Sequence, residues 1–312
     1  MAARKIVIDC DPGQDDAIAI LMALASPDRL EVAAITTVAG NVPLALTEKN
    51  ARALVELAGR DDVPVHIGCS RPMLRPLETA EYVHGETGLN GANLAEPRIA
   101  PAPGHAVDAI LGILAREPEG SVTLVPTGPL TNVALAMVKA PEVMARAAQI
   151  VLMGGAVDLG NVTPAAEFNI YVDPHAAHVV FGFGLPITMF GLDVTHKVTV
   201  TDARLEAIRA IDTPAGRAAY GMLEFYNRYD RQRYDTEGGP LHDPCTIAWL
   251  LEPALFEGRD CFVEIDTTSP TCIGRTVVDW WRRSDHPPNA TVMREADADG
   301  FFRLLNDCLK RL

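Results

Sequence analysis

The sequence lacks the features of several common protein classes. Its 312 residues include no apolar run of the roughly 18 residues that a membrane-spanning helix needs. The N-terminal stretch reaches an aspartate after a few apolar residues, which is not the pattern of a signal peptide. Positive charge is scarce, since 27 Lys and Arg face 41 Asp and Glu and give a net charge of −14. We therefore expect neither a membrane nor a nucleic acid as the main partner.

Cysteine is sparse and no C-x-x-C pair is present. A disulfide framework is unusual in a chain of this length, so the pattern predicts reduced thiols in a cytoplasmic protein. The six cysteines are Cys10, Cys69, Cys245, Cys261, Cys272 and Cys308.

Several catalytic signatures are also missing. The sequence has no G-x-S-x-G, no Walker loop, no H-E-x-x-H and no G-x-G-x-x-G after its first strand. It has no internal repeat and no linker-like segment. Hydrophobic residues make up 48% and charged residues 22%, as in soluble globular proteins. We therefore expect one domain over residues 1–312.

Short β-branched runs alternate with amphipathic stretches in the first two thirds of the chain. This alternation predicts βαβ units, and hence an α/β, Rossmann-like fold with a mostly parallel sheet and helices on both faces. The last third reads as a helical elaboration with one β-rich piece at 261–280. We expect strands at 5–9, 30–40, 63–68, 121–128, 149–156 and 185–193, and helices at 15–26, 46–59, 105–117 and 129–141.

Polar or glycine-rich stretches follow the predicted strands. Because ligands of such sheets bind at the carboxyl ends of the strands, these stretches predict a single site. They are DCDPGQDD (9–16), TVAGN (37–41), PTGPLTN (126–132), MGGAVDLGN (153–161) and GLDVTH (191–196).

The first of these stretches carries four aspartates, Asp9, Asp11, Asp15 and Asp16. Capping of a helix N-terminus explains Asp15 and Asp16 only. Carboxylates this crowded raise one another's pKa unless a cation neutralises them. With no histidine or cysteine in the motif, Ca²⁺ or Mg²⁺ is favoured over zinc.

The stretch DCDPGQDDAIAI resembles the N-terminal signature of the nucleoside hydrolases. Four later segments fit the same family in order, and HGETGLNG (84–91) resembles the active-site loop of its inosine–uridine-preferring branch. The segments are TTVAGN (36–41), PTGPLTN (126–132), MGGAVDLGNVTPAAEFNIYVDPHAAHVV (153–180) and HDPCTIAWLLEP (242–253).

The resemblance implies a bound Ca²⁺. Its ligands would be Asp11, Asp16, Asp243 and the backbone carbonyl of Thr127. Hard oxygen donors of this kind suit Ca²⁺. Asp243 precedes Pro244 and also fits a helix N-cap, and both roles are compatible if one carboxylate oxygen serves each.

The resemblance also implies a reaction, the hydrolysis of purine and pyrimidine ribonucleosides to ribose and free base. Asp11 would take the proton of the attacking water, Asp15 would hold a ribose hydroxyl, and Asp9 would orient the neighbouring carboxylates. The ring would pass through an oxocarbenium-like state that carboxylates stabilise. Hydrogen bonds to the ribose hydroxyls are implied for Asn41, Asn161, Glu167 and Asn169. Met153 would pack beside the sugar, unless it is an ordinary core methionine at a strand end.

The leaving base also needs a partner. His242 resembles the family's histidine near the base, and its titration near neutral pH suits a proton donor, although a lone histidine is often structural. His84 lies in a glycine-rich loop and would act as a mobile lid residue that contacts ribose. Tyr229 and Arg233 share one face of a predicted helix and would close over the base, unless this is an ordinary exposed helix.

Two other functions stay open on the sequence alone. The D-x-D of Asp9 and Asp11 also begins Mg²⁺-dependent phosphatases of the HAD type, but the extra negative charge of P-G-x-D-D would repel phosphate. A non-catalytic, metal-stabilised nucleoside-binding protein is the second alternative, and it has no need of a base at Asp11. By the resemblance, the partner is a small ribonucleoside and the protein forms a homodimer or homotetramer.

Overall fold

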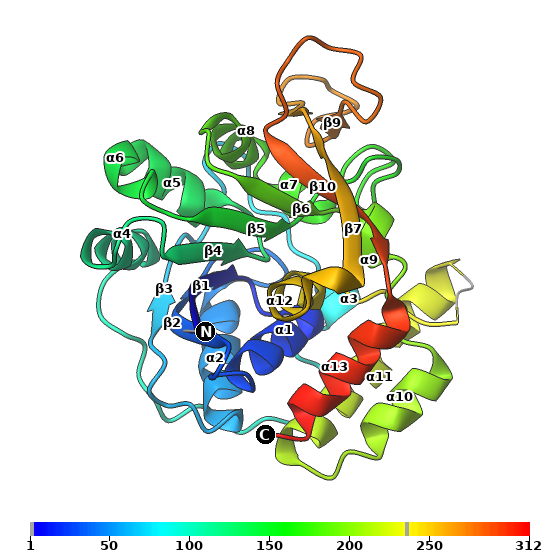
Figure 1. The fold of residues 1–312 in the computed structure, drawn as a ribbon. Coiled ribbons are helices and arrows are strands. Elements are labelled where there is room, and N and C mark those ends of the chain that lie inside the picture. The colour runs from blue at the N-terminus through cyan, green and yellow to red at the C-terminus, as the bar shows by residue number, and fades with distance from the viewer. Residues whose placement is uncertain (1–2, 235–236) are drawn as a thin grey trace.

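The computed structural model describes residues 3–234 and 237–312. Within them an eight-stranded sheet has the order β3-β2-β1-β4-β5-β6-β10-β7 (Figure 1). All neighbouring strands pair in parallel except β10 and β7, which are antiparallel. The strands are β1 (Arg4–Cys10), β2 (Leu30–Thr37), β3 (Val65–Ile67), β4 (Val122–Pro126), β5 (Gln149–Met153), β6 (Ile187–Phe190), β7 (Phe256–Cys261) and β10 (Ala290–Ala296).

Helices cover both faces of this sheet, as predicted. One face packs against α1, α2, α11, α12 and α13, and the other against α4, α5, α6 and α8 (Figure 1). Every residue of α1 is buried, because the sheet, α2, α11, α12 and α13 surround it. The bounds are α1 (Gln14–Leu24), α2 (Leu44–Leu57), α4 (Ala106–Arg116), α5 (Thr131–Lys139), α6 (Pro141–Met144), α8 (Pro174–Gly182), α11 (Pro214–Tyr234), α12 (Pro244–Leu251) and α13 (Ala298–Leu309).

Four further helices complete the connections. They are α3 (Glu81–His84), α7 (Phe168–Val172), α9 (Leu192–Thr195) and α10 (Asp202–Arg209), and the 3₁₀ turn η1 spans Pro253–Leu255. Each strand and helix expected in the first two thirds of the chain is present, with ends that differ by a few residues. The mostly parallel α/β fold is therefore confirmed.

The last third contains the expected helices, α10 to α13, and it also adds strands that were not expected. It contributes β10 and β7, which extend the central sheet beyond β6. The edge strand β7 carries charged, exposed residues, and its burial pattern does not alternate regularly, so its residues do not show the pattern of a strand. The β-rich piece 261–280 forms two short antiparallel strands, β8 (Val263–Ile265) and β9 (Thr276–Val278).

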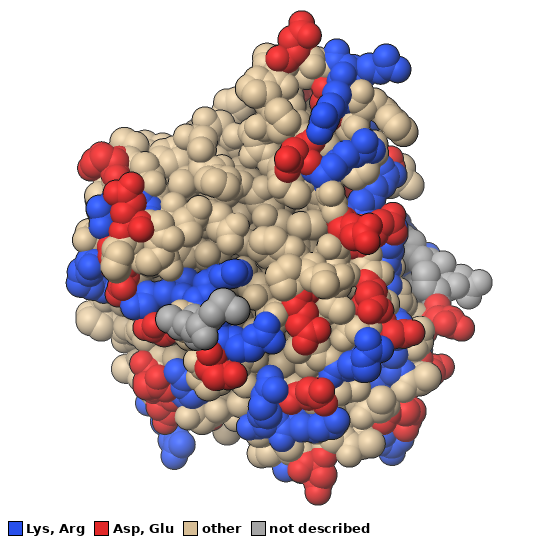
Figure 2. Space-filling model, viewed as in Figure 1, with Lys and Arg blue, Asp and Glu red and all other residues tan. Residues whose placement is uncertain are grey.

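The surface and the cysteines agree with the composition. Acidic and basic side chains are interspersed over the face in Figure 2, without a large area of one sign. All six cysteines are free thiols. Across the described ranges, no helix is both long and apolar enough to cross a membrane.

Candidate active site

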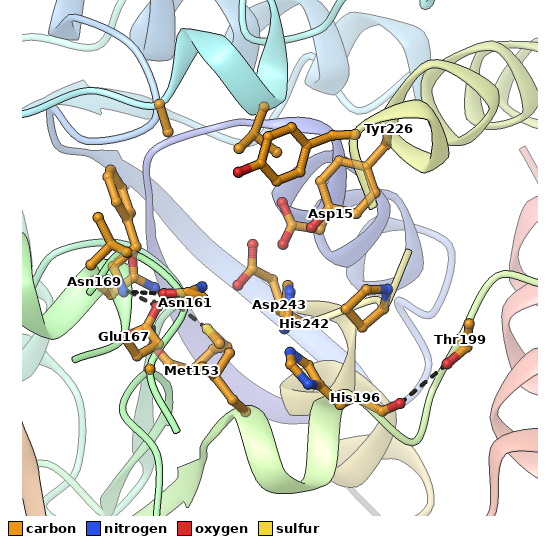
Figure 3. Close-up of a pocket in the computed structure, with 18 of the residues that line it drawn as sticks. Asp15, Met153, Asn161, Glu167, Asn169, His196, Thr199, Tyr226, His242 and Asp243 are labelled. Carbon is orange, nitrogen blue, oxygen red and sulfur yellow. Dashed lines mark hydrogen bonds between the residues drawn. The ribbon is translucent and has the colours of Figure 1, made fainter. Parts of the chain in front are cut away.

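The loops that follow β1, β2, β4, β5 and β6 meet at one end of the sheet. There they border a cavity of about 890 Å³ (Figure 3). Thr127, directly after β4, donates its backbone N–H to the carbonyl of Asp9 at 2.8 Å, so the β1 and β4 loops leave the sheet together. The convergence of polar loops predicted from the sequence is therefore present in the fold.

Three aspartates meet at the inner end of this cavity. Asp15, Asp16 and Asp243 each bring a carboxylate oxygen within 4.8 Å of the other two, and all three are buried. In Figure 3 the carboxylates of Asp15 and Asp243 point toward the same space. Asp15 and Asp16 come from the first turn of α1, whereas Asp243 precedes α12, so the cluster joins segments from opposite ends of the chain.

Asp11 and Asp16 lie beneath the cavity and are fully buried. Asp16 accepts a hydrogen bond from the N–H of Gly13, the residue before α1, at 3.1 Å, and another from the Thr127 hydroxyl at 2.7 Å. Asp11 accepts the Asn41 N–H at 2.6 Å on Oδ2. Among the described residues, no hydrogen-bond donor reaches Oδ1 of Asp11 or Oδ1 of Asp15.

Burial raises the pKa of every carboxyl in this cluster. It raises the pKa of Asp16 to about 6 and, with the charge of Asp16, that of Asp15 to about 7. The pKa of Asp11 is raised well above its usual value by burial and by Asp16, and that of Asp243 by burial and by Asp15. Buried carboxylates with orphaned oxygens and no basic partner fit a cation, and all-oxygen donors fit Ca²⁺ or Mg²⁺.

Two glycines leave room for the Asp11 carboxylate. A Cβ added at Gly40 would lie 2.1 Å from Oδ2 of Asp11, and one added at Gly128 would lie 2.4 Å from Oδ1. Neither distance is possible without movement of the carboxylate or the loop. The loops after β2 and β4 therefore hold Asp11 between them.

We expect Gly128→Ala to displace the Asp11 carboxylate. The substitution should lower kcat about 100-fold, because a shift of about 1 Å at a catalytic group has an effect of this size. It should also lower the free energy of unfolding by about 1–3 kcal/mol. The control is Gly182→Ala, where an added Cβ meets nothing within 4 Å. Ribonucleoside hydrolysis, the activity that the family resemblance implies, and thermal unfolding of both variants check this expectation, and unchanged kcat in Gly128→Ala would contradict it.

Asp9 belongs to a separate polar network under the site. Its Oδ1 accepts hydrogen bonds from the Thr36 hydroxyl at 2.6 Å and from the Asn132 amide at 2.8 Å. Burial raises the pKa of Asp9 to about 6, against the lowering effect of these two bonds. Asn132 also accepts the Cys69 N–H at 2.9 Å. Asp9 thus fastens the ends of β1 and β2 to the start of α5, in line with a role in orientation.

The expected capping role of Asp243 is wrong. Asp243 stands at the N-cap position of α12, but its side chain makes no capping hydrogen bond. Its backbone is helical, with φ −62° and ψ −39°, whereas a capping residue is normally extended, so the carboxylate turns away from the first N–H groups. Both Asp243 oxygens are therefore available to the aspartate cluster.

A second wall of the cavity carries Met153, Asn161, Glu167 and Asn169 (Figure 3). Glu167 begins α7 and accepts the N–H groups of Asn169 at 2.9 Å and Gly155 at 2.8 Å. Burial raises the pKa of Glu167 to about 7. Asn169 donates its amide to the carbonyl of Thr127 at 2.7 Å. This wall is thereby tied to the proposed metal site through the carbonyl of Thr127.

His242 lines the cavity next to His196, with ring centroids 5.6 Å apart. Its Nδ1 lies 2.7 Å from the Thr195 hydroxyl, which leaves Nε2 for a ligand. The expectation that His242 titrates near neutral pH is wrong. Burial, and then the charges of His196 and His84, lower its pKa well below the usual value. A lowered pKa favours the neutral ring, which can donate or accept a hydrogen bond.

The remaining residues predicted to contact the ligand differ in their burial and in whether they line the cavity. Asn41 and His84 line the cavity and are buried. Tyr229 also lines it, from α11, and its ring lies 5.7 Å from that of Tyr82. Arg233 lies on the same helix but is exposed and is not among the residues that line the cavity.

Several residues at the site were not predicted from the sequence. Thr195 and His196 belong to the GLDVTH loop, which had been recognised only as a polar loop after a strand. Tyr226 lines the cavity from α11, and its ring lies 5.8 Å from that of His84. It precedes the predicted Tyr229 by three positions, so helical spacing was the available signal.

Comparison with known proteins agrees with this geometry. Residues 6–303 match the model of a family described as inosine-uridine preferring nucleoside hydrolase. A relative from Photobacterium profundum, named pyrimidine-specific ribonucleoside hydrolase RihA, is 50% identical over 308 residues, which cover 98% of this chain and 99% of the relative. A protein of the same name from Salmonella gallinarum is 48% identical over 309 residues, which cover 99% of each chain.

Comparison with solved structures also finds nucleoside hydrolases. A plant nucleoside hydrolase, PpNRh1, superposes with a TM-score of 0.91 at 36% identity and covers 98% of this chain and 99% of its own. A purine-preferring ribonucleoside hydrolase from Gardnerella vaginalis has a TM-score of 0.91 at 33% identity, with the same coverage. This chain is thus a nucleoside hydrolase, and it belongs to the inosine-uridine preferring nucleoside hydrolase family.

Proposed function

We propose that the protein is a Ca²⁺-dependent enzyme that hydrolyses the N-glycosidic bond of ribonucleosides to ribose and free base. The observation that carries this proposal is the buried aspartate cluster, which faces a cavity whose second wall holds amide and carboxylate groups. Such a pairing suits a neutral sugar with several hydroxyls. A cytoplasmic location and a homodimer or homotetramer stay predictions.

The cation would be held by Asp11, Asp16, Asp243 and the carbonyl of Thr127. Its positive charge would offset the repulsion of the carboxylates and lower the pKa of a bound water. Asp15 also lies within 4.8 Å of Asp16 and Asp243. We assign Asp15 to a ribose hydroxyl, because its carboxylate lines the cavity whereas Asp11 and Asp16 lie beneath it.

Asp11 would accept the proton of the water that attacks the anomeric carbon. Its Oδ1 has no hydrogen-bond partner among the described residues, and its Oδ2 is fixed by the Asn41 N–H. A carboxylate whose orientation is fixed in this way is ready to take a proton without rearrangement. Asn161, Glu167 and Asn169 would bind ribose hydroxyls, and the nearby carboxylates would stabilise the positive charge of the oxocarbenium-like state.

The leaving base would lie toward the histidines and tyrosines of the cavity. The Nε2 of His242 is free of the Thr195 contact and faces this part, so it would hydrogen-bond the base. The neutral state of His242 supports a hydrogen-bonding role more strongly than full proton donation. Direct protonation by His242, and closure of Tyr229 and Arg233 over the base, stay predictions.

Both purine and pyrimidine ribonucleosides are expected to react. The tryptophans, at 249, 280 and 281, are not among the residues that line the cavity, so the structure offers no tryptophan pair for stacking a purine. The relatives named pyrimidine-specific support uridine and cytidine as the better substrates. Values of kcat/KM for uridine, cytidine, inosine and adenosine test this order, and release of base from none of them would overturn the proposed function.

The sugar specificity gives a separate expectation. Hydrogen bonds between a ribose hydroxyl and a carboxylate such as Asp15 contribute about 1.5–3 kcal/mol each. We therefore expect kcat/KM for 2′-deoxyuridine to lie on the order of 100-fold below that for uridine. Base release from the two nucleosides, measured side by side, checks this, and equal rates would contradict the assignment of Asp15 to the ribose.

A further inference from the structure

His84 is held by a residue that the proposed mechanism does not use. The side chain of Gln14 lies between Gly13 and Asp15 in the aspartate motif, and it is fully buried. Its Oε1 lies 2.7 Å from Nδ1 of His84, and its Nε2 donates to the backbone carbonyl of His84 at 2.9 Å. Gln14 therefore contacts both the ring and the backbone of His84.

The chemistry of these contacts fixes the orientation of the Gln14 amide. Carbonyl oxygens only accept hydrogen bonds, and the carbonyls of His84 and Asn90 both lie within reach of the Gln14 amide nitrogen, at 2.9 and 3.4 Å. The NH₂ group must face them, so Oε1 must face the imidazole. An amide oxygen accepts only, and the ring nitrogen that it contacts must therefore carry the proton.

The ring of His84 is also fixed in position. A Cβ added at Gly13 would lie 2.5 Å from Nδ1 and 2.7 Å from Cε1 of His84, so the ring packs directly on the Pro-Gly turn. Tyr226 lies on another side, with its ring centroid 5.8 Å away. Flipping of the ring would break the contact with Gln14 without an alternative partner for Nδ1.

The loop that carries His84 is tied to the same turn. The amide of Asn50 donates to the carbonyls of Pro12 at 3.0 Å and Thr87 at 2.8 Å. At the far end of the loop, an added Cβ at Gly91 would lie 2.1 Å from the carbonyl oxygen of Gly221 in α11. The loop is thus held against α1 and α11. These contacts do not support the prediction that His84 is a mobile lid residue.

We propose that Gln14 is a positioning residue that fixes His84 as the Nδ1–H tautomer, so that Nε2 presents a lone pair to the cavity. His84 lines that cavity, and no hydrogen bond to Nε2 is formed within the described residues. His84 is then a hydrogen-bond acceptor, and it selects a donor on the ligand, such as a ribose hydroxyl or a base N–H. Burial lowers the pKa of His84 to about 3, which agrees with a ring that stays neutral. The choice of ligand rests on the proposed function, whereas the tautomer does not.

The tautomer is measured by ¹⁵N NMR of the full chain labelled at its 8 histidines. His84→Gln identifies the signals of His84 by their loss. We expect one shift typical of a protonated Nδ1 and one typical of a bare Nε2. A protonated Nε2, or a mixture of tautomers, would overturn the proposal. This measurement needs no substrate, so it separates a wrong tautomer from a wrong proposed function.

The role in specificity is measured by a double-mutant cycle on uridine. Gln14→Met keeps the side-chain length but removes all the side-chain hydrogen bonds of Gln14, and it should lower kcat/KM about 10-fold, mainly through KM. Combined with His84→Gln, it should cause no further loss, because both changes remove the same acceptor. Lys139→Met, on an exposed surface, is the control for added methionine. Additive losses in the double variant would overturn the proposal.

Discussion

Asp11→Ala is expected to lower kcat for uridine by about 10⁴-fold, with a much smaller change in nucleoside binding. Removal of a general base alone has effects of 10²–10⁴-fold, and Asp11 is also a proposed ligand of the cation. The fully buried carboxylate, with one oxygen fixed by Asn41 and the other unpartnered within the described residues, is the structural reason.

The comparison variant for Asp11→Ala is Asp61→Ala. Asp61 is an exposed aspartate far along the chain from the motif, and it should keep wild-type kinetics. Thermal unfolding separates a catalytic loss from a folding defect, and equilibrium binding of uridine separates catalysis from affinity. Substantial turnover in a folded Asp11→Ala protein would end the assignment of Asp11 as the base.

Removal of divalent cations by a chelator is expected to lower activity at least about 10³-fold. A divalent cation typically contributes several kcal/mol of charge stabilisation at such sites. Readdition of Ca²⁺ should restore activity. If activity does not fall after chelation, or if no added cation restores it, the proposed cofactor role is wrong.

Removal of the cation by a chelator should also lower the stability of the folded protein. A ligand that binds only the folded state stabilises it by about 2.7 kcal/mol at 100 times its Kd. The effect should be visible here because the cation would join Asp11 and Asp16 to Asp243, which comes from the other end of the chain. Asp243→Asn should weaken Ca²⁺ binding in calorimetric titration, and Asp61→Asn should not. An equal Ca²⁺ affinity in Asp243→Asn would contradict the ligand set.

The central sheet was predictable because its strands are apolar on both faces and are followed by polar loops. β1, for example, is buried over its last five residues and then enters the aspartate motif. β7 and β10 were not predictable in the same way. β7 carries glutamate, glycine, arginine and aspartate on an edge, where solvent accepts them, so its sequence resembles a loop.

The residues of the site also divide into those that could be predicted from the sequence and those that could not. The aspartate motif itself signals a cation near Asp11 and Asp16, whereas Asp243 was assigned only through the family resemblance of its segment. Gln14 could not be predicted, because a glutamine in that motif gains meaning only from its contacts with His84, which lies far along the chain. The lowered pKa of His242 was also not predictable, since it results from burial that no local pattern encodes.

The measurement that tests the central claim most directly is a mass balance on uridine in phosphate-free buffer with Ca²⁺. The account predicts equal amounts of uracil and ribose from the wild-type protein, and neither product after chelation or from Asp11→Ala. Release of no base from any ribonucleoside, together with hydrolysis of p-nitrophenyl phosphate, would contradict it and favour a phosphatase.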